Sequence, residues 1–376
     1  MKMLAAVIYQ TALAKPYQQS QPIHIEQVDL EGPGEGEVLV EVRAAGLCHS
    51  DLSHIAGKFS RKLPLVPGHE GAGIVREVGR GVKALKPGDH VVMTVPTGCG
   101  HCGYCYENKG LLCDTVSDAR AQGGLLSGVR RLSLGGKTLY HYAGISSFAQ
   151  YAVLEPNALV KIDPSIPLDV AALFGCAVVT GAGCVLNAAK VRPGQNVAVF
   201  GLGGVGLNTV MASKLAGATE IIGIDINEDK FPLAVELGCT RTFSARDPDL
   251  VAKIREITEG GVDYAFEISG VSTAMTAANA ITRKAGEIIC VGVPGPADVY
   301  QYSQAALVVE EKTFRGSLMG SGVPHRDIPR YLKFFRAGKL PVDRLMSGAI
   351  GFSALNENFD LLDRGSVLRQ VLLPHG

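Results

Sequence analysis

The chain has 376 residues, of which 47% are hydrophobic and 19% are charged, and its 36 basic residues balance 36 acidic ones. This neutral balance argues against nucleic acid or an anionic membrane as the main partner. The chain is longer than a domain with a single hydrophobic core usually is, so we expect two domains. No apolar run reaches the length of a signal or membrane segment, which predicts a cytoplasmic protein. In that compartment its nine cysteines should be ligands, nucleophiles or core residues rather than disulfides.

The pattern of apolar residues, and with it the predicted secondary structure, changes near the middle of the chain. Residues 1–170 hold short apolar runs such as "EVLVEVRAAG" and "GAGIVREVG", broken by Gly and Pro, which predict an antiparallel β-rich domain. From about 178 to 320, apolar strands alternate with helical stretches, which predicts βαβ units and a parallel sheet. We therefore expect the α/β class, with one domain built from 1–177 and 321–376 and the other from 178–320.

Three potential metal ligands lie apart in the first domain. "GLCHSDLSHIAG" (46–57) offers Cys48, "VPGHEGAG" (66–73) offers His69, and "LFGCAVVTGAG" offers Cys176. Two cysteines, one histidine and a water molecule are a known catalytic zinc arrangement that keeps one position open. Each residue taken singly is as well explained as part of the core or of a loop, so the residues alone leave both interpretations open.

Four more cysteines lie together in the lobe 97–113, "TGCGHCGYCYENKGLLC". Their spacing, C-x2-C-x2-C-x7-C, differs from the bacterial ferredoxin run, which ends in C-x3-C-P. Cysteines two residues apart are also poorly placed for an unstrained disulfide. We predict a closed tetrahedral zinc site that shapes the lobe and takes no part in the reaction. Its ligands would be Cys99, Cys102, Cys105 and Cys113.

The segment 194–230 predicts a dinucleotide site. An apolar strand at 197–200 leads into a G-x-G-x-x-G turn and a helix at 205–215, and a second strand at 221–224 ends in Asp225. The glycines let the backbone approach a pyrophosphate at the helix N-terminus. An acid closing the second strand accepts ribose hydroxyls and repels a 2′-phosphate, which favours NAD over NADP.

Taken together, these motifs resemble the zinc-dependent medium-chain alcohol dehydrogenases, and within them the liver-type branch, which has the long segment 114–146. The matching stretches include "GLCHSD", "PGHEGAGIV", "KPGDHVV", "LFGCAVVTGAG", "GLGGVGL" and "GIDINEDK", and the similarity runs from about residue 5 to Arg369. The resemblance implies a GroES-like β-rich catalytic domain plus a Rossmann doubly wound parallel-sheet domain. It also implies NAD(H), two zinc ions per chain and reversible oxidation of primary alcohols to aldehydes.

The resemblance also assigns roles. Cys48, His69 and Cys176 would bind the catalytic zinc. Glu70 would be an alternate ligand behind it, and Asp51 would fix the tautomer of His69. Ser50 would hold the substrate hydroxyl and begin proton removal. The expected cofactor-binding residues are His49, Gly201, Gly203, Gly204, Val205, Gly206, Asp225, Lys230, Val291, Ser317, Met319 and Arg369.

Two positions depart from the family pattern. Many relatives have a histidine three residues after the position of Ser50, where this chain has Ser53 followed by His54. Either His54 enters the proton relay, or Ser53 and water carry the proton. His49 replaces the arginine of some members, so we expect weaker binding of the NADH pyrophosphate when the imidazole is neutral.

The resemblance leaves the substrate open. The small side chains of Val95 and Ala143 favour aryl, allylic or medium-chain alcohols. An alternative is a thiol-dependent formaldehyde dehydrogenase, whose adduct would need cations such as Arg120, Arg130 or Arg131. A non-catalytic zinc and NAD(H) binding protein would not explain why Ser50 flanks an open metal site. We expect a homodimer or homotetramer formed through the sheet edge at 295–318. The expected pocket walls are Ser50, Phe59, Val95, Tyr142, Ala143, Val293 and Leu318.

Overall fold

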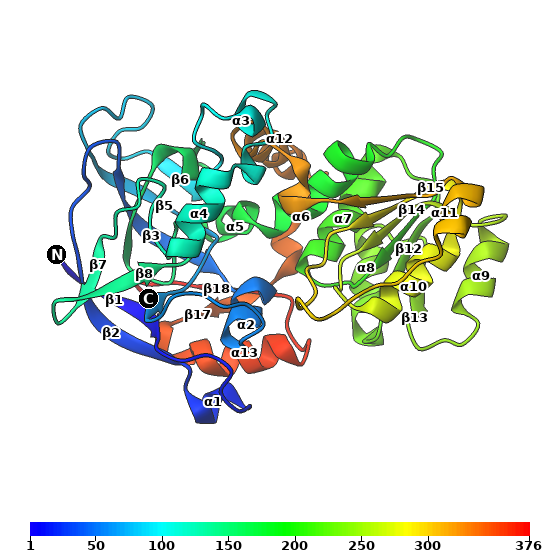
Figure 1. Cartoon of the computed structure of the whole chain (residues 1–376), viewed down its shortest axis with the longest axis horizontal. Helices are drawn as coiled ribbons and strands as arrows, with labels where there is room; N and C mark the ends of the chain where they lie inside the picture. Colours follow the sequence, from blue (N-terminus) through cyan, green and yellow to red (C-terminus); the bar gives the residue numbers. More distant parts are fainter. The chain divides into compact units, whose positions relative to one another are not determined.

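The computed structural model describes all 376 residues, which separate into two compact units (Figure 1). The first unit holds residues 1–176, 323–329 and 343–376, and the second holds 177–322 and 330–342. The second unit includes Ala177, 321–322 and 330–342, which the sequence analysis placed with the first domain. In the second unit the fully buried Tyr331 accepts a hydrogen bond from the side-chain amide of Asn187 at 3.2 Å.

The first unit consists of a closed barrel and a seven-stranded sheet. The barrel order is β1-β2-β7-β8-β4, and the sheet order is β10-β6-β5-β3-β18-β17, with β9 also paired to β3. Most pairs are antiparallel, as predicted, but the β4–β8 and β17–β18 pairs are parallel. These strands are β1 (Lys2–Ile8), β2 (Ile23–Leu30), β3 (Val38–Gly46), β4 (Leu65–Val66), β5 (Gly71–Val78), β6 (His90–Met93), β7 (Leu132–Leu134), β8 (Lys137–His141), β9 (Tyr151–Leu154), β10 (Leu159–Ile162), β17 (Met346–Ile350) and β18 (Arg369–Leu372).

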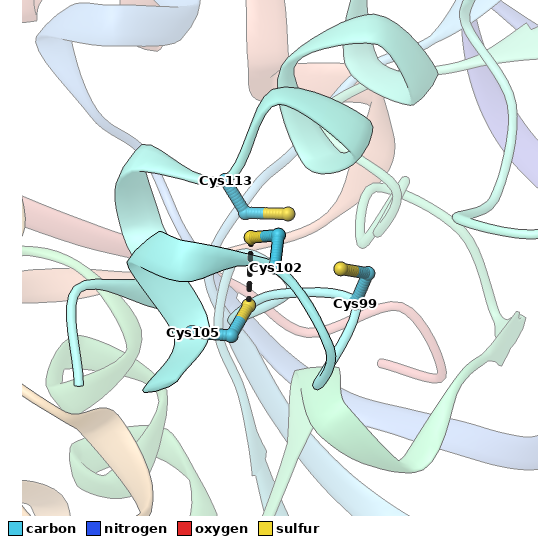
Figure 2. Close-up of side chains that lie close together, drawn as sticks. All are labelled: Cys99, Cys102, Cys105 and Cys113. Atoms are coloured by element: carbon cyan, nitrogen blue, oxygen red, sulfur yellow. Dashed lines mark hydrogen bonds between the residues drawn. The ribbon is translucent and has the colours of Figure 1, made fainter. Parts of the chain in front are cut away.

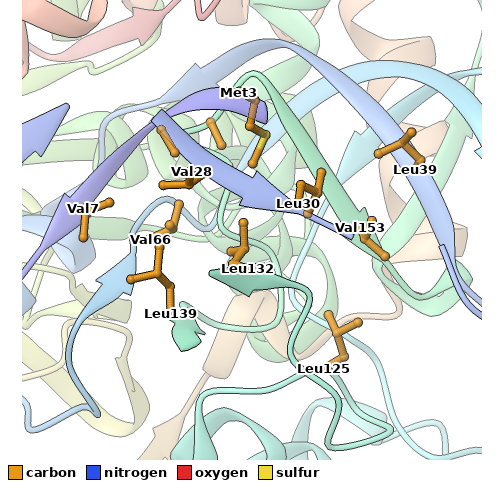
Figure 3. Packing of buried hydrophobic residues seen from close by; sticks show 12 residues of the cluster. Met3, Val7, Val28, Leu30, Leu39, Val66, Leu125, Leu132, Leu139 and Val153 are labelled. Atoms are coloured by element: carbon orange, nitrogen blue, oxygen red, sulfur yellow. The ribbon is translucent and has the colours of Figure 1, made fainter. Parts of the chain in front are cut away.

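The barrel strands share one hydrophobic cluster (Figure 3). Met3 and Val7 from β1 pack with Leu30 from β2, Leu132 from β7 and Leu139 from β8. Each of these side chains is at most 3% exposed. Burial of that much aliphatic surface is the main stabilising contribution to the barrel, at about 25 cal/mol per Å².

The helices of the first unit are short, and two of them position candidate site residues. Helix α2 begins directly after Cys48, and α4 begins directly after Cys113. Helix α13 holds the N-terminal segment, because the Asp360 carboxylate accepts from the backbone N–H of Tyr17 at 2.8 Å. These helices are α1 (Tyr17–Ser20), α2 (His49–Ile55), α3 (Gly103–Tyr106), α4 (Asp114–Gln122), α5 (Leu168–Ala172) and α13 (Leu355–Asp363), and α12 (Pro324–Arg336) begins in this unit.

The second unit is built on one parallel sheet in the order β13-β12-β11-β14-β15-β16. Counted along the chain this order is 3-2-1-4-5-6, the arrangement of a doubly wound nucleotide-binding fold, which confirms the predicted α/β class. The strands are β11 (Val197–Phe200), β12 (Ile221–Asp225), β13 (Arg241–Ser244), β14 (Val262–Glu267), β15 (Thr282–Cys290) and β16 (Thr313–Gly316). The helices are α6 (Ala177–Gly183), α7 (Gly204–Ala216), α8 (Phe231–Leu237), α9 (Leu250–Ile257), α10 (Ser272–Ile281) and α11 (Gln304–Glu310).

The central strands of this sheet are buried along their whole length. Every residue of β11 and β12 is buried, as expected of parallel strands covered on both faces. No single helix of the chain has the length and hydropathy needed to cross a membrane. Leu168–Gly175 and Ala177–Ala189 reach those limits only when they are counted together across a bend.

Candidate functional site

The structure brings Cys48, His69 and Cys176 together in the first unit. Cys48 lies between β3 and α2, His69 between β4 and β5, and Cys176 directly after the turn Leu173–Gly175. All three are buried, and their potential ligand atoms lie within 4.8 Å of one another. Gly175 makes this approach possible, because a Cβ there would overlap the Met93 carbonyl oxygen. Three residues far apart in the chain thus form one compact ligand group.

The orientation of His69 fits metal binding. Its Nδ1 lies 3.0 Å from the Asp51 carboxylate, the acid predicted to fix the tautomer of His69, and both side chains are buried. Its Nε2 is buried without a hydrogen-bond partner. A buried polar atom without a partner is costly, and here it lies beside two sulfur atoms. An imidazole and two thiols are the donors that zinc prefers, so these residues fit the expected ion.

The ligand group changes the pKa values of its own members. A hydrogen bond from Cys176 holds the pKa of Cys48 well below its usual value; His69 and Arg369 add to this lowering, and burial opposes it. Burial lowers the pKa of His69, but Asp51 and Cys48 raise it to about 10. The lowered pKa of Cys48 favours its thiolate, the form that binds metals.

Glu70 and Arg369 form a buried ion pair. The Glu70 carboxylate lies against the Arg369 guanidinium, and both side chains are buried. Glu70 does not belong to the group of three ligand atoms in this structure. It stays a prediction that Glu70 is an alternate zinc ligand. It also stays a prediction that Arg369 binds the pyrophosphate of the cofactor. His49, the other residue expected at the pyrophosphate, is exposed at the start of α2.

Tyr142 links several residues beside the ligand group. Its hydroxyl donates to the Ser50 carbonyl oxygen at 3.2 Å. Its ring centroid lies 5.3 Å from that of His54 and 5.9 Å from that of His69. Burial raises the pKa of Tyr142 well above its usual value, so the phenol remains a donor. Tyr142 was expected only as a pocket wall, but its hydroxyl and ring connect Ser50 to both histidines.

The two proton-relay candidates differ in their surroundings. His54 is 1% exposed, its Nδ1 lies 3.3 Å from the Phe59 carbonyl oxygen, and its Nε2 has no partner within the protein. Burial lowers the pKa of His54, and the Phe59 carbonyl and Asp51 only partly oppose this. Ser53 is half-buried on the same helix. The Ser50 Oγ lies 3.8 Å from the Cys48 Sγ, so the residue expected to begin the relay lies beside an expected metal ligand.

The remaining predicted pocket residues fall in both units. Val95 is buried, and Ala143 is half-buried with a φ of 55°, a left-handed conformation that disfavours bulky β-branched residues. Val293 and Leu318 belong to the second unit, where they are 67% and 43% exposed.

The four cysteines of the lobe 97–113 converge as their spacing predicts (Figure 2). Their sulfur atoms lie within 4.8 Å of one another, and the Cys102 and Cys105 sulfurs are 3.5 Å apart. The backbone N–H of Gly100 donates to the Cys105 sulfur at 3.4 Å. Four thiols at this separation fit a zinc ion with no open position.

The predicted phosphate-binding turn joins β11 to α7 in the second unit. A Cβ at Gly206 would overlap the Gly201 carbonyl oxygen, so only glycine lets the helix pack against the turn. The Asp225 carboxylate accepts from the Leu202 backbone N–H at 2.6 Å and pairs with Lys230 at 3.1 Å. Asp225, the last residue of β12, thus also holds the glycine-rich turn. Three residues predicted to bind the cofactor lie at the end of this turn and the start of α7, namely Gly203, Gly204 and Val205.

Two more predicted cofactor contacts lie at the carboxyl edge of the same sheet. Cys290 and Gly316 pair at the ends of β15 and β16, so Val291 and Ser317 follow side by side. The Ser317 backbone N–H donates to the Cys290 carbonyl at 2.9 Å. Met319 adopts a left-handed conformation with a φ of 47°.

The three arginines considered for binding a thiol adduct differ in their hydrogen-bond and ion-pair partners. Arg131 pairs with Glu37 at 2.8 Å and with Glu31 at 2.9 Å, so its charge is already compensated. Arg130 donates to the Gln122 carbonyl at 2.8 Å. The side chain of Arg120 has no hydrogen-bond or ion-pair partner, and the same holds for the side chain of Arg61.

Comparisons with known proteins agree with this architecture. Residues 34–164 match the family model described as "Alcohol dehydrogenase GroES-like domain", and residues 204–337 match "Zinc-binding dehydrogenase". An alcohol dehydrogenase zinc-binding domain protein from Burkholderia ambifaria is 36% identical over 100% of both chains, with a TM-score of 0.93. Benzyl alcohol dehydrogenase from Acinetobacter calcoaceticus is 32% identical over 99% of both chains, with a TM-score of 0.92. Alcohol dehydrogenase from Thermus sp. ATN1 is 27% identical over 99% of both chains, with a TM-score of 0.81.

Proposed function

Because this chain belongs to the zinc-dependent medium-chain alcohol dehydrogenase family, a family of oxidoreductases, we propose that it catalyses reversible NAD-linked oxidation of primary alcohols to aldehydes. The long segment 114–146 supports a place in the liver-type branch. One observation carries the proposal: the buried group of Cys48, His69 and Cys176 with an unpartnered imidazole nitrogen. Three protein ligands leave one position of a tetrahedral metal for a substrate oxygen.

The chain's own residues account for binding and proton transfer. Zinc at the three ligands supplies a Lewis acid, and a bound nicotinamide supplies a hydride acceptor. Asp51 holds the imidazole of His69 in one tautomer. The Ser50 Oγ takes the proton of the alcohol, and Tyr142 fixes the backbone of Ser50 while this happens. The proton then leaves through His54 or through Ser53 and water.

The second unit supports NAD as the cofactor. The glycine-rich turn and the N-terminus of α7 would receive the pyrophosphate. Asp225 would accept the ribose hydroxyls beside Lys230 and repel a 2′-phosphate. The backbone at Val291, Ser317 and Met319 would hold the nicotinamide carboxamide. A strong preference for NAD over NADP, weakened in Asp225→Ala, is the expected result.

The substrate proposal favours large primary alcohols. Val95 and the left-handed Ala143 keep bulky groups out of this part of the first unit. One relative is named as a benzyl alcohol dehydrogenase. We therefore propose aryl, allylic or medium-chain alcohols, oxidised in the cytoplasm, where the thiols of the four-cysteine lobe stay reduced. Activity confined to ethanol would contradict this substrate range.

We also propose self-association through the edge of the parallel sheet. β16 is the last strand of that sheet, and on the neighbouring α11 Val308 and Val309 are 69% and 75% exposed. An open strand edge beside exposed aliphatic side chains favours pairing with a second copy. The proposed assemblies are a homodimer or a homotetramer.

Zinc content and NAD reduction test the function together. Purified protein should hold two zinc ions per chain and reduce NAD with benzyl alcohol and cinnamyl alcohol. Cys48→Ser should lose one zinc ion and all turnover but keep NAD binding. Cys239→Ser changes a buried thiol outside both cysteine groups and should keep both activity and zinc. Full activity in Cys48→Ser, or no oxidation of any alcohol, would overturn the proposal.

The unpartnered Arg120 favours a second candidate, oxidation of a hydroxymethyl-thiol adduct of formaldehyde. Such an adduct commonly carries carboxylates, which need a cation to bind them. NADH formation from formaldehyde that depends strictly on an added thiol would identify this activity.

A further inference from the structure

The segment that follows β16 in the second unit has an unusual backbone. Met319, Gly320 and Ser321 all adopt the left-handed conformation, with φ values of 47°, 69° and 50°. This conformation is unfavourable for residues with a Cβ atom, and it persists at such residues only where the surrounding structure holds it. Met319 is also one of the residues whose backbone is expected to hold the nicotinamide carboxamide. The contacts that fix 319–321 therefore bear on the binding of the nicotinamide.

Helix α6 contacts this segment backbone to backbone. A Cβ at Gly320 would overlap the Val179 carbonyl oxygen, and a Cβ at Gly183 would lie 2.7 Å from the Gly320 Cα. Neither position has room for a side chain. A glycine on each side therefore lets α6 support the left-handed segment directly.

The π-helix Cys184–Ala189, which continues α6, adds two polar contacts. The side-chain amide of Asn187 donates to the Gly320 carbonyl at 3.4 Å. The Ala188 carbonyl accepts from the Arg315 guanidinium at 3.3 Å, and Arg315 lies on β16. Turns of π-helix are rare and occur frequently at functional sites. Here one such turn is bonded both to β16 and to the segment that follows it.

The orientation of Asn187 is itself fixed. Its side-chain amide also donates to the hydroxyl of Tyr331 at 3.2 Å, and Tyr331 on α12 is fully buried. Two other side-chain bonds hold the segment at its edges, from Thr180 to the Met319 sulfur at 3.7 Å and from Ser321 to the Ser317 hydroxyl at 3.2 Å. Asn187 differs from them because it bonds the backbone of the left-handed residues.

We propose that Asn187 is a positioning residue for the nicotinamide, because it holds the backbone of 319–321 in the conformation that receives the carboxamide. Without this bond the segment can relax to more ordinary conformations, and nicotinamide binding then has to restore the left-handed one. The pyrophosphate and the adenosine are expected at the glycine-rich turn and at Asp225, so their binding should not depend on Asn187. The inference rests on the proposed function and adds a residue to its cofactor site.

A comparison of NADH with ADP-ribose separates the two parts of the cofactor. ADP-ribose carries the adenosine and the pyrophosphate but no nicotinamide. The Kd of each ligand should be measured by calorimetry for the wild type and for Asn187→Ala, without substrate. We expect Asn187→Ala to raise the Kd for NADH about 5-fold, the scale of one hydrogen bond, and to leave that for ADP-ribose within about 2-fold. A merely structural role of Asn187 would weaken both ligands alike.

Two further variants assign the effect to this contact. Asn187→Asp keeps the shape of the side chain but turns an acceptor oxygen toward the Gly320 carbonyl, so it should weaken NADH binding at least as much. It keeps the test decisive if Asn187→Ala unfolds. Asn279→Ala is the matched control, because Asn279 on α10 also donates to a tyrosine hydroxyl, that of Tyr300 at 3.0 Å. Its loss should change neither Kd.

The outcomes separate this inference from the proposed function. Unchanged NADH binding in either folded variant of Asn187, or equal weakening of NADH and ADP-ribose, would overturn the inference alone if the wild type oxidises alcohols. A wild type that binds neither ligand, or that oxidises no alcohol, would overturn the proposed function and this inference with it.

Discussion

His141 should make the stability of the protein depend on pH in a defined range. It lies in β8 with 3% exposure, and its Nε2 accepts from the Arg131 backbone N–H at 3.2 Å. Burial, together with the charges of Arg130 and Arg131, lowers the pKa of His141 from 6.5 to about 4. Only the neutral imidazole can accept this hydrogen bond, so protonation opposes folding.

The size of the effect follows from proton linkage. In the unfolded chain His141 binds a proton near pH 6.5, whereas in the folded chain it does so only near pH 4. The folded state therefore binds fewer protons in this range, and its stability falls as the pH is lowered from 6.5 to 4. Since one pKa unit corresponds to 1.36 kcal/mol, His141 accounts for a loss of about 3 kcal/mol. Above pH 6.5 its contribution is constant.

His141→Gln isolates this contribution. The glutamine side chain offers an oxygen to the Arg131 N–H and does not titrate. The free energy of unfolding of both proteins should be measured in denaturant between pH 4 and pH 7.5. All other titrating groups, including the metal ligands, are common to both, so the difference between the two curves reports His141. That difference should shift by about 3 kcal/mol in favour of the variant at low pH.

A matched control uses the exposed His24 of β2, where His24→Gln should leave the wild-type pH dependence unchanged. If the curves of His141→Gln and the wild type run parallel from pH 7.5 to 4, the reasoning about the buried imidazole is refuted.

The remaining predictions concern the metal lobe, the relay, the cofactor and the assembly. Cys102→Ala should lose the lobe zinc and lower the melting temperature, because three thiolates cannot close the site; unchanged zinc content by mass spectrometry would contradict this. Tyr142→Phe should lower kcat/KM about 5-fold by removing the bond to the Ser50 carbonyl, worth about 1 kcal/mol, and equal rates would exclude that role. His49→Arg should lower the Kd for NADH measured by fluorescence, and no change would reject the weakened phosphate contact. Val309→Glu should dissociate the assembly in light scattering, whereas a monomeric wild type would disprove the interface.

The strands and helices of the second unit were predictable because the sequence patterns that determine them are local. The helix expected at 205–215 spans Gly204–Ala216, and the strand expected at 197–200 is β11. Glycines and continuous apolar runs determine these elements through the conformations of nearby residues. The four cysteines of the lobe converge for the same reason, since at most fourteen positions separate them along the chain.

The surroundings of the ligand group were not predictable from local signals. Tyr142 reaches Ser50 across 92 positions, and Glu70 meets Arg369 near the end of the chain. Such contacts depend on how β8, α2 and β18 are placed by the barrel and the sheet. For Tyr142 the family resemblance indicated only a pocket wall.

The same residue type serves two different purposes in this chain, and the number of ligands decides which. In the lobe, four half-buried or buried sulfurs can complete the coordination of zinc, so a metal there can stabilise structure but cannot admit a substrate. At Cys48 and Cys176, two buried sulfurs and one imidazole leave a position unfilled, and burial strengthens electrostatic interactions by excluding water. The proposed reaction therefore belongs at the group of Cys48, His69 and Cys176, although the four-cysteine lobe has the more conspicuous sequence signal.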